Sequence, residues 1–306
     1  MEKVVSVKNI GKRYGKNVAL QDVTFSVEAG SCFGLLGPNG AGKSTTMKVL
    51  TGIVEADQGD VTILGKEAGK QRREIQRQVG YVPQAITLYE KLSAYENLVF
   101  FGEMNGVRGR LLKQRITEVL EQTGLSDRAN DAVKTFSGGM KRRINIAVAL
   151  LHKPKLLILD EPTVGIDPQS RNRIFEIIRT LKGDGVTTIY STHYMEEVEA
   201  LCDHIAIIDH GKVITEGSLN DLFDRYGKKS LYYEATGVVN APTFTHTTKV
   251  YPKNKGWVIE TEHPVETMQD VLRDAQVKGL EIKALEMMRP NLETVFLSLT
   301  GTSLRD

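Results

Sequence analysis

The sequence of 306 residues contains little cysteine and no long apolar run. Two isolated cysteines, Cys32 and Cys202, form neither a disulfide framework nor a zinc site, so we expect two small buried thiols in a reducing compartment. No stretch reaches the roughly 18 uncharged apolar residues of a membrane helix. The start, residues 1–4, has no apolar signal core. We therefore expect that this chain does not itself cross a membrane.

The sequence also lacks a strong charge of either sign. Lysine and arginine number 40 against 38 acidic residues, a net charge of +2, and this argues against a nucleic acid as partner. Hydrophobic residues make up 41% and charged residues 25%, as in ordinary globular proteins. A chain of this length can bury the cores of one large and one small domain.

Hydrophobic patterning predicts a mixed sheet followed by alternating strands and helices. Alternation over residues 3–10 and 22–28 predicts antiparallel strands with one solvent-facing side. The continuous apolar run 32–36 predicts a buried strand that feeds a glycine turn and a helix at 43–51. Further strands are expected at 60–64, 79–82, 156–160, 186–191, 204–209 and 212–216, and helices at 93–123, 138–151, 168–182 and 194–202. Such alternation indicates a parallel sheet covered on both faces.

The pattern changes after about residue 228. Short strands with Pro, Asn, Gly and Thr turns are expected over 230–263, then a helix at 266–278, a strand at 280–286 and a helix at 291–299. We therefore predict one domain over residues 1–228 and a small α+β accessory domain over 229–306.

Residues 37–44 read G-P-N-G-A-G-K-S and fit the pattern G-x-x-x-x-G-K-[ST]. Its glycines let backbone amides approach phosphate oxygens, and the following helix presents its positive end to them. Lys43 would supply charge to the β- and γ-phosphates, and the Ser44 hydroxyl would ligate Mg²⁺. The residues expected to hold the nucleotide here are Gly37, Pro38, Asn39, Gly40, Ala41, Gly42, Lys43, Ser44 and Thr45. A glycine-rich turn with an exposed lysine is the plainer alternative, and kinases and GTPases share the motif.

The apolar strand 156–159 ends in two carboxylates, Asp160 and Glu161. Ligands bind at the carboxyl ends of strands in α/β folds, so both would face the phosphates. Asp160 would hold Mg²⁺ through water, and Glu161 would orient and deprotonate the attacking water. A strand followed by a solvated acidic turn is the alternative.

A second glycine-opened helix begins after Phe136, with Ser137 as its N-cap and Gly138 and Gly139 in its first turn. This is a second anion-binding helix tip, about a hundred residues after the first. A two-fold dimer gives it a role, because each tip can then face the nucleotide of the partner. An ordinary capped helix is the alternative.

Together these segments resemble the ATP-binding cassette (ABC) family. Tyr14 resembles its adenine-stacking aromatic residue, and Gln84 resembles the Q-loop glutamine that touches Mg²⁺ and the membrane partner. Residues 137–139 resemble the signature motif, Asp167 lies in a D-loop-like segment that contacts the second cassette, and His193 resembles the switch histidine that reads the γ-phosphate. A lone histidine or tyrosine would otherwise be interpreted as a structural residue.

The resemblance covers roughly residues 3–220 and implies an α/β P-loop NTPase fold. That fold has a parallel core, an antiparallel N-terminal β subdomain and a helical signature subdomain. The implied ligands are ATP and Mg²⁺. The implied catalytic residues are Glu161, His193 and Lys43; the implied metal ligands are Ser44, Gln84 and Asp160.

One departure concerns the usual signature, Leu-Ser-Gly-Gly-Gln, whose ends are Phe136 and Met140 here. Methionine cannot hydrogen-bond as a glutamine amide does, but the anion-binding Ser and Gly are kept. This form resembles the subgroup that serves drug, polysaccharide and lipid exporters. The segment 290–301 resembles the C-terminal segment of the same subgroup.

The resemblance implies an ATPase subunit on the cytoplasmic face of the cell membrane, where it is peripheral. Its partners would be a membrane-spanning permease and a second copy of itself or a paralogous cassette, with no nucleic acid. The alternatives are a soluble ABC ATPase acting on ribosomes or DNA, a GTPase or small-molecule kinase, and a nucleotide-binding scaffold without turnover. The segment 254–257, Asn-Lys-Gly-Trp, lacks the aspartate of a guanine-binding motif.

Overall fold

The computed structural model describes residues 2–237 and 240–300, which divide into two compact units, one up to Leu219 and one from Asn220. This division comes before the predicted boundary at 228. The difference arises because hydrophobic patterning did not predict the helix α8 (Leu219–Tyr226), which buries Leu222 completely. The backbone that follows α8 lies against Pro290 of the second unit, since a Cβ on Gly227 would come within 2.6 Å of that ring.

The first unit is built on a six-stranded sheet with the order β10-β9-β3-β8-β7-β6. Its strands are β3 (Cys32–Leu36), β6 (Val79–Val82), β7 (Leu156–Asp160), β8 (Thr187–Thr192), β9 (His204–Asp209) and β10 (Lys212–Ser218). All neighbours pair in parallel except β10, which follows Gly211 (φ 73°) and returns antiparallel to β9. Every residue of β3, β7 and β8 is buried, as a sheet covered on both faces requires.

A second sheet has the order β2-β1-β4-β5 and is antiparallel. Its strands are β1 (Lys3–Tyr14), β2 (Asn17–Glu28), β4 (Gln58–Ile63) and β5 (Lys66–Glu67). The first two run longer than their alternation predicts because register shifts between Val7 and Lys12 interrupt the alternation without ending the strand. One face of this sheet packs on the core that also contains Met47 and Leu50.

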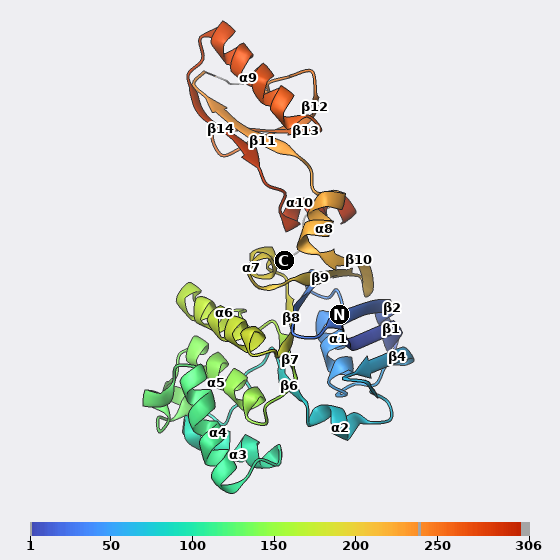
Figure 1. The fold of residues 1–306 in the computed structure, drawn as a ribbon, viewed down its shortest axis with the longest axis vertical. Coiled ribbons are helices and arrows are strands. Elements are labelled where there is room, and N and C mark those ends of the chain that lie inside the picture. Colours follow the sequence, from blue (N-terminus) through green and yellow to red (C-terminus); the bar gives the residue numbers. More distant parts are fainter. Residues whose placement is uncertain (1, 238–239, 301–306) are drawn as a thin grey trace. The chain divides into compact units, whose positions relative to one another are not determined.

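Helices complete the first unit: α1 (Lys43–Leu50), α2 (Arg72–Gln76), α3 (Ala94–Met104), α4 (Gly109–Gln122), α5 (Gly138–Leu150), α6 (Pro168–Gly183) and α7 (Met195–Leu201). The break between α3 and α4 falls at Gly106 (φ 80°) and Gly109 (φ 60°), as predicted. The helices α3, α4 and α5 gather in one group beyond β6 and β7, away from α1 (Figure 1). The fold is therefore the predicted parallel core with an antiparallel β subdomain and a helical subdomain.

The second unit holds a four-stranded antiparallel sheet with the order β12-β13-β11-β14. After α8 its elements are β11 (Ser230–Ala235), β12 (Thr247–Lys253), β13 (Gly256–Thr261), α9 (Pro264–Lys278), β14 (Ile282–Met288) and α10 (Leu292–Thr300). Helix α9 lies along this sheet, and its core includes Leu231, Ile259 and Val271 (Figure 1). In the C-terminal segment 290–301, Gly301 lies outside the described residues. Among the described residues, no helix is long and apolar enough to span a bilayer.

Candidate active site

The glycine loop between β3 and α1 contains two positions, Gly37 and Gly42, that only glycine can occupy. A Cβ on Gly37 would lie 2.1 Å from the carbonyl oxygen of Ile208, and a Cβ on Gly42 would lie 2.9 Å from that of Ala19. Gly42 is the N-cap of α1 and adopts φ 109°, which non-glycine residues rarely adopt. The loop is therefore held tightly against β9 and β2, with the N-terminus of α1 at its end.

Lys43, the first residue of α1, is buried, with 4% of its surface exposed. Its ammonium donates to the carbonyl oxygens of Gly37 (2.8 Å) and Pro38 (3.0 Å) and lies 3.0 Å from Glu161 Oε1. The plainer expectation of an exposed lysine in a turn is thus wrong. The lysine instead links its own loop to the end of β7.

Asp160 ends β7 and accepts two hydrogen bonds on Oδ1. The donors are the hydroxyls of Ser44 (3.1 Å) and Ser191 (2.8 Å). Burial raises the pKa of Asp160, and the two hydroxyl donors act in the opposite direction. Burial and the neighbouring Asp160 carboxylate raise the pKa of Tyr81 on the adjacent strand β6. Neither Ser191 nor Tyr81 was among the predicted site residues, although Tyr81 lies three residues before Gln84 and Ser191 two residues before His193.

Glu161 is the point at which the predicted catalytic residues meet. Its Oε2 accepts from Gln84 Nε2 (2.9 Å), and its Oε1 lies 3.0 Å from the Lys43 ammonium and 3.5 Å from His193 Nδ1. Its backbone adopts φ 46°, an uncommon value for a side chain of this size, and its amide donates to Ser191. The exposed acidic turn considered for this segment is therefore wrong, because Glu161 is buried.

A pocket of about 350 Å³ opens beside these groups. Tyr14 stands at its wall with 47% of its surface exposed, and the Lys12 ammonium lies 5.8 Å from its ring centre. Most of the predicted nucleotide-binding residues line the pocket, together with the predicted base Glu161: Tyr14, Asn39, Gly40, Gly42, Lys43, Ser44, Thr45 and Gln84. The remaining residues of the loop, Gly37, Pro38 and Ala41, are not among its lining.

The second helix tip and the D-loop segment lie together but do not line this pocket. Ser137 is exposed and its hydroxyl accepts from the amide of Met140 (3.3 Å), so it caps α5 as predicted. Asp167 caps α6 by accepting from the amide of Ser170 (2.9 Å). A Cβ on Gly139 would lie 2.1 Å from Ser170 Oγ, so the two caps are neighbours.

Arg142, one turn into α5, joins this helix to the segment that carries Gln84. Its guanidinium is buried and donates to the carbonyl oxygens of Pro83 (2.7 Å) and Gln84 (2.5 Å). Sequence reasoning missed this residue because it follows the signature in a run of three basic residues, which reads as a solvated charge cluster.

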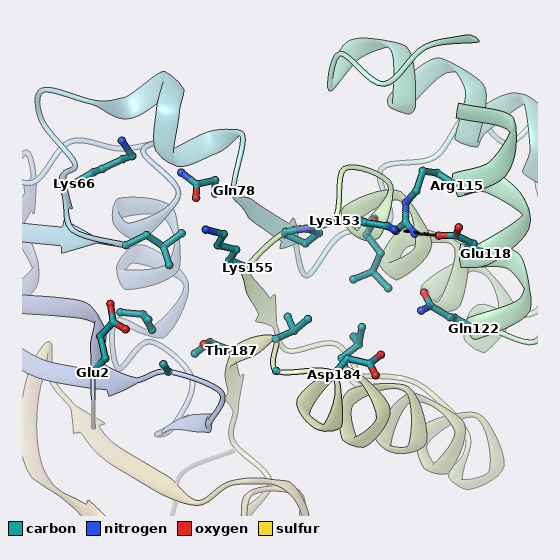
Figure 2. Close-up of a pocket in the computed structure, with 18 residues that line it drawn as sticks. Glu2, Lys66, Gln78, Arg115, Glu118, Gln122, Lys153, Lys155, Asp184 and Thr187 are labelled. Atoms are coloured by element: carbon teal, nitrogen blue, oxygen red, sulfur yellow. Dashed lines mark hydrogen bonds and ion pairs between the residues drawn. The ribbon is translucent and has the colours of Figure 1, made fainter. Parts of the chain in front are cut away.

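A larger cavity, of about 690 Å³, lies at the opposite edge of the same sheet, where β7 and β8 begin. Side chains of both signs surround it, among them Arg115, which is paired with Glu118, as well as Lys155 and Asp184 (Figure 2). It contains no glycine loop at a helix N-terminus, and parallel sheets bind ligands at their carboxyl edge. The smaller pocket beside Lys43 is therefore the one that suits a triphosphate.

Comparison with known proteins agrees with this geometry. A family model described as ABC transporter matches residues 20–164. The linearmycin resistance ATP-binding protein LnrL of Bacillus subtilis (strain 168) is 45% identical over 311 residues, which cover 99% of this chain and 100% of that protein. The Nod factor export ATP-binding protein I of Sinorhizobium fredii (strain NBRC 101917 / NGR234) is 36% identical over 307 residues, 99% of this chain and 87% of that protein.

Solved structures give the same result. The structure of an ATP-binding subunit of an ABC transporter has a TM-score of 0.66 and 33% identity, covering 73% of this chain and 93% of that one. A dimeric ATP-binding cassette in a post-hydrolysis state, bound to ADP and Pi, has a TM-score of 0.64 and 27% identity, covering 70% of this chain and 98% of that one. In sequence and in fold, this chain belongs to the ATP-hydrolysing, ATP-binding subunits of the ABC transporter family.

Proposed function

We propose that two copies of this chain close around two Mg·ATP and power an exporter whose membrane path is formed by a separate permease. The observation that carries this proposal is the convergence of Lys43, Gln84 and His193 on the carboxylate of Glu161. Relatives named for Nod factor export and linearmycin resistance support an exporter. They give no support to an ATPase acting on ribosomes or DNA.

The contacts of Glu161 suggest how the site starts a cycle. The γ-phosphate of an entering ATP would compete with Glu161 Oε1 for the Lys43 ammonium, which now lies 3.0 Å away. Glu161 would then be free to accept a proton from the attacking water, while the hydrogen bond from Gln84 holds its position. Its backbone, strained at φ 46°, would keep the carboxylate aimed at the pocket.

The oxygen groups of Ser44, which lines the pocket, and of the buried Asp160 suit Mg²⁺. Ser44 and Asp160 already share a hydrogen bond of 3.1 Å, and a hydroxyl and a carboxylate oxygen are hard ligands of the kind that Mg²⁺ prefers. Within residues 2–237 and 240–300, no group of three His, Cys, Asp or Glu side chains could hold a metal unaided. This fits an ion that completes its shell with phosphate oxygens and water. When bound, Mg²⁺ would neutralise charge on the β- and γ-phosphates.

The second copy would supply Ser137 and Gly139. Both lie at the N-terminus of α5, and the exposed Ser137 hydroxyl and helix end could take a γ-phosphate from outside the chain. Asp167 lies beside this tip and would contact the second copy. The cassette solved as a dimer with ADP and Pi supports a dimer of such chains.

The surface near Gln84 would receive the permease. Tyr89, Phe100 and Met104 are exposed there by 50%, 38% and 70%, and Tyr89 packs edge-on against Phe100 with ring centres 4.9 Å apart. The buried Asn97 fixes this loop by hydrogen bonds to the backbone of Tyr89 (2.8 and 3.0 Å). Exposed apolar clusters of this kind mark contact surfaces. The chain would thus sit on the cytoplasmic face of the membrane through Leu88, Tyr89 and α3.

The variant Glu161→Gln tests the proposal in the full chain. Its amide keeps the shape but cannot take a proton, so we expect turnover to fall by more than about a hundredfold. ATP should still bind, and the chain should dimerise in saturating Mg·ATP on light scattering. Glu196→Gln, an exposed glutamate on α7, is the matched control and should behave as wild type. Undiminished turnover in Glu161→Gln would reject Glu161 as the base, and a strictly monomeric variant would reject the dimer.

A further inference from the structure

Glu197 of α7 is a buried carboxylate that the proposed mechanism does not use. Only 1% of its surface is exposed. Among residues 2–237 and 240–300, no lysine, arginine or histidine forms an ion pair with it. An unpaired charge in the interior is costly unless hydrogen bonds satisfy it. The position therefore calls for a physical explanation.

Three hydroxyl groups surround this carboxylate. Thr163 Oγ1 donates to Oε1 at 2.7 Å, while the Tyr190 hydroxyl and Thr192 Oγ1 donate to Oε2 at 2.9 and 2.8 Å. All three donors are buried. Burial raises the pKa of Tyr190, and the neighbouring Glu197 carboxylate raises it further. An ionised carboxylate accepts at both oxygens, so it can hold all three donors at once.

Thr192 connects Glu197 to the switch histidine. Its Oγ1 also accepts from the amide of Tyr194 at 3.0 Å, so one side chain ties down the backbone on both sides of His193. The carbonyl oxygen of Thr192 in turn accepts from the amide of Gly37 at 3.4 Å, which links the same residue to the phosphate loop.

Thr163 connects Glu197 to the turn that carries Glu161. Its carbonyl oxygen accepts from the amide of Ile166 at 3.1 Å, and the carbonyl of Glu161 accepts from the amide of Val164 at 3.4 Å. This tight turn contains the strained backbone of Glu161, and strain of this kind persists only where its surroundings hold it.

We infer that Glu197 is a positioning residue for ATP hydrolysis, which fixes the His193 loop and the Glu161 turn to each other through Thr192 and Thr163. This inference rests on the proposed roles of Glu161 and His193. Glu197 touches neither ATP nor the reacting water in this assignment. It holds in place two segments that lie about thirty residues apart in sequence. Their side chains, His193 and Glu161, thereby stay close, with Nδ1 and Oε1 3.5 Å apart.

The first experiment measures steady-state ATP hydrolysis by the full chain in Mg·ATP. We expect Glu197→Ala to lower kcat about thirtyfold or more and to change KM for ATP by less than about threefold, because misplacement of catalytic groups acts on the rate of chemistry. Glu197→Gln keeps the volume and two of the acceptor positions, so it should restore most of the lost rate. Glu196→Ala, an exposed neighbour on the same helix, is the control and should match wild type.

Variants of the three hydroxyl donors distinguish an effect on the catalytic geometry from an effect on the stability of the fold. Thr192→Val and Thr163→Val remove a donor next to a catalytic segment, so both should lower kcat. Tyr190→Phe removes a donor from the middle of a strand, so it should lower the melting temperature without lowering kcat. Equal loss of kcat in all three, or loss in none, would overturn the inference.

A double-mutant comparison distinguishes this inference from the proposed function itself. If Glu197 acts through His193, then Glu197→Ala, which alone lowers kcat about thirtyfold, should cost almost nothing further in a His193→Ala background, whereas independent effects would multiply. A full further loss in that background would overturn the positioning role while leaving the proposed function intact. Wild-type activity that survives Glu161→Gln would instead reject the proposed function, whatever Glu197 does.

Discussion

The helices α1 and α5 both have glycine at or next to their first residue, Gly42 before α1 and Gly138 in α5, but their N-termini differ in almost every other respect. At α1, Lys43 is 4% exposed and is bonded to the carbonyls of Gly37 and Pro38 and to Glu161. At α5, Ser137 is exposed and its hydroxyl bonds the amide of Met140 in its own helix. Both tips carry the partial positive charge of a helix N-terminus. Only the tip of α1 lines the 350 Å³ pocket and contacts the carboxylates of Asp160 and Glu161.

This difference indicates which tip is a complete site. In the proposed function, the first has a cation, hydroxyl and carboxylate groups that would hold a metal, and a base, all in one chain. The second has a hydroxyl and a helix dipole, with Asp167 as its acidic neighbour. Such a tip can add to a phosphate that is already held, but it supplies no base or metal ligands of its own. The comparison therefore favours a second tip that completes the site of another copy.

The strongest test of the comparison removes the cation from the first tip. We expect Lys43→Ala to weaken ATP binding at least about tenfold, because a charge-assisted contact is lost and Glu161 keeps a buried charge. Turnover should fall on the order of a thousandfold. Nucleotide titration and phosphate release measure the two effects. Lys48→Ala, an exposed lysine on the same helix, is the control, and equal losses in both variants would contradict a special role for the first tip.

The next largest effect is expected at the second tip. Gly138→Asp places a carboxylate where a phosphate would approach, so turnover should fall about a hundredfold while ATP affinity of the isolated chain stays within about threefold. Gly138→Ala is the control, because its Cβ would meet only Ile166 Cδ1, at 3.8 Å. If the aspartate variant lost ATP affinity as Lys43→Ala does, the second tip would belong to the site of its own chain.

The elements of the first tip could be predicted from the sequence because its loop residues follow one another in one short segment, residues 37–44. The spacing from Gly37 to Ser44 predicts the loop, the cation and the proposed metal ligand together. The apolar strand before Asp160 predicts that the two carboxylates lie at the carboxyl edge of the sheet. The parallel sheet followed from the same alternation of strands and helices. Local spacing therefore recovered most of the groups that line the pocket beside Lys43.

The supporting contacts could not be predicted in this way. Glu197 stands between the exposed residues Glu196 and Glu199, and three acidic residues on a short helix read as a solvated face. Its burial depends on β8 and on the turn after β7, which the fold alone brings together. Cys32 and Cys202 are both buried, as predicted, but that their sulfur atoms lie 3.8 Å apart could not be predicted from 170 residues of separation.

A smaller effect is expected on stability, and it concerns the first tip alone. Burial raises the pKa of Asp160, so the folded chain holds this proton at higher pH than the unfolded chain does. As the pH rises from 3.8, the ordinary pKa of an aspartate, through the raised pKa of the folded chain, ionisation of Asp160 therefore destabilises the fold increasingly. At neutral pH we expect Asp160→Asn to stabilise the nucleotide-free chain by about 1 kcal/mol, as relief of strain at functional sites commonly does.

Thermal unfolding at several pH values measures this. The gain of Asp160→Asn should shrink as pH falls toward 3.8, because the wild-type carboxyl is then neutral as well. Asp184→Asn, at the opposite edge of the sheet, is the control and should show no gain. A gain that is the same at every pH would show that the charge of Asp160 is not its cause.

The smallest effect is expected from restoring the usual signature ending. The backbone amide of Met140 donates to Ser137 Oγ, and its side chain makes none of the hydrogen bonds found among the described residues, so Met140→Gln leaves the cap unchanged. An added amide could donate one more hydrogen bond to a nucleotide across a dimer, a net gain of about 1 kcal/mol at most. We therefore expect turnover to change by less than about fivefold, with equal melting temperature and equal ATP affinity of the single chain. A change of a hundredfold would mean that the second tip binds phosphate through this side chain, and not through Ser137 and the helix end.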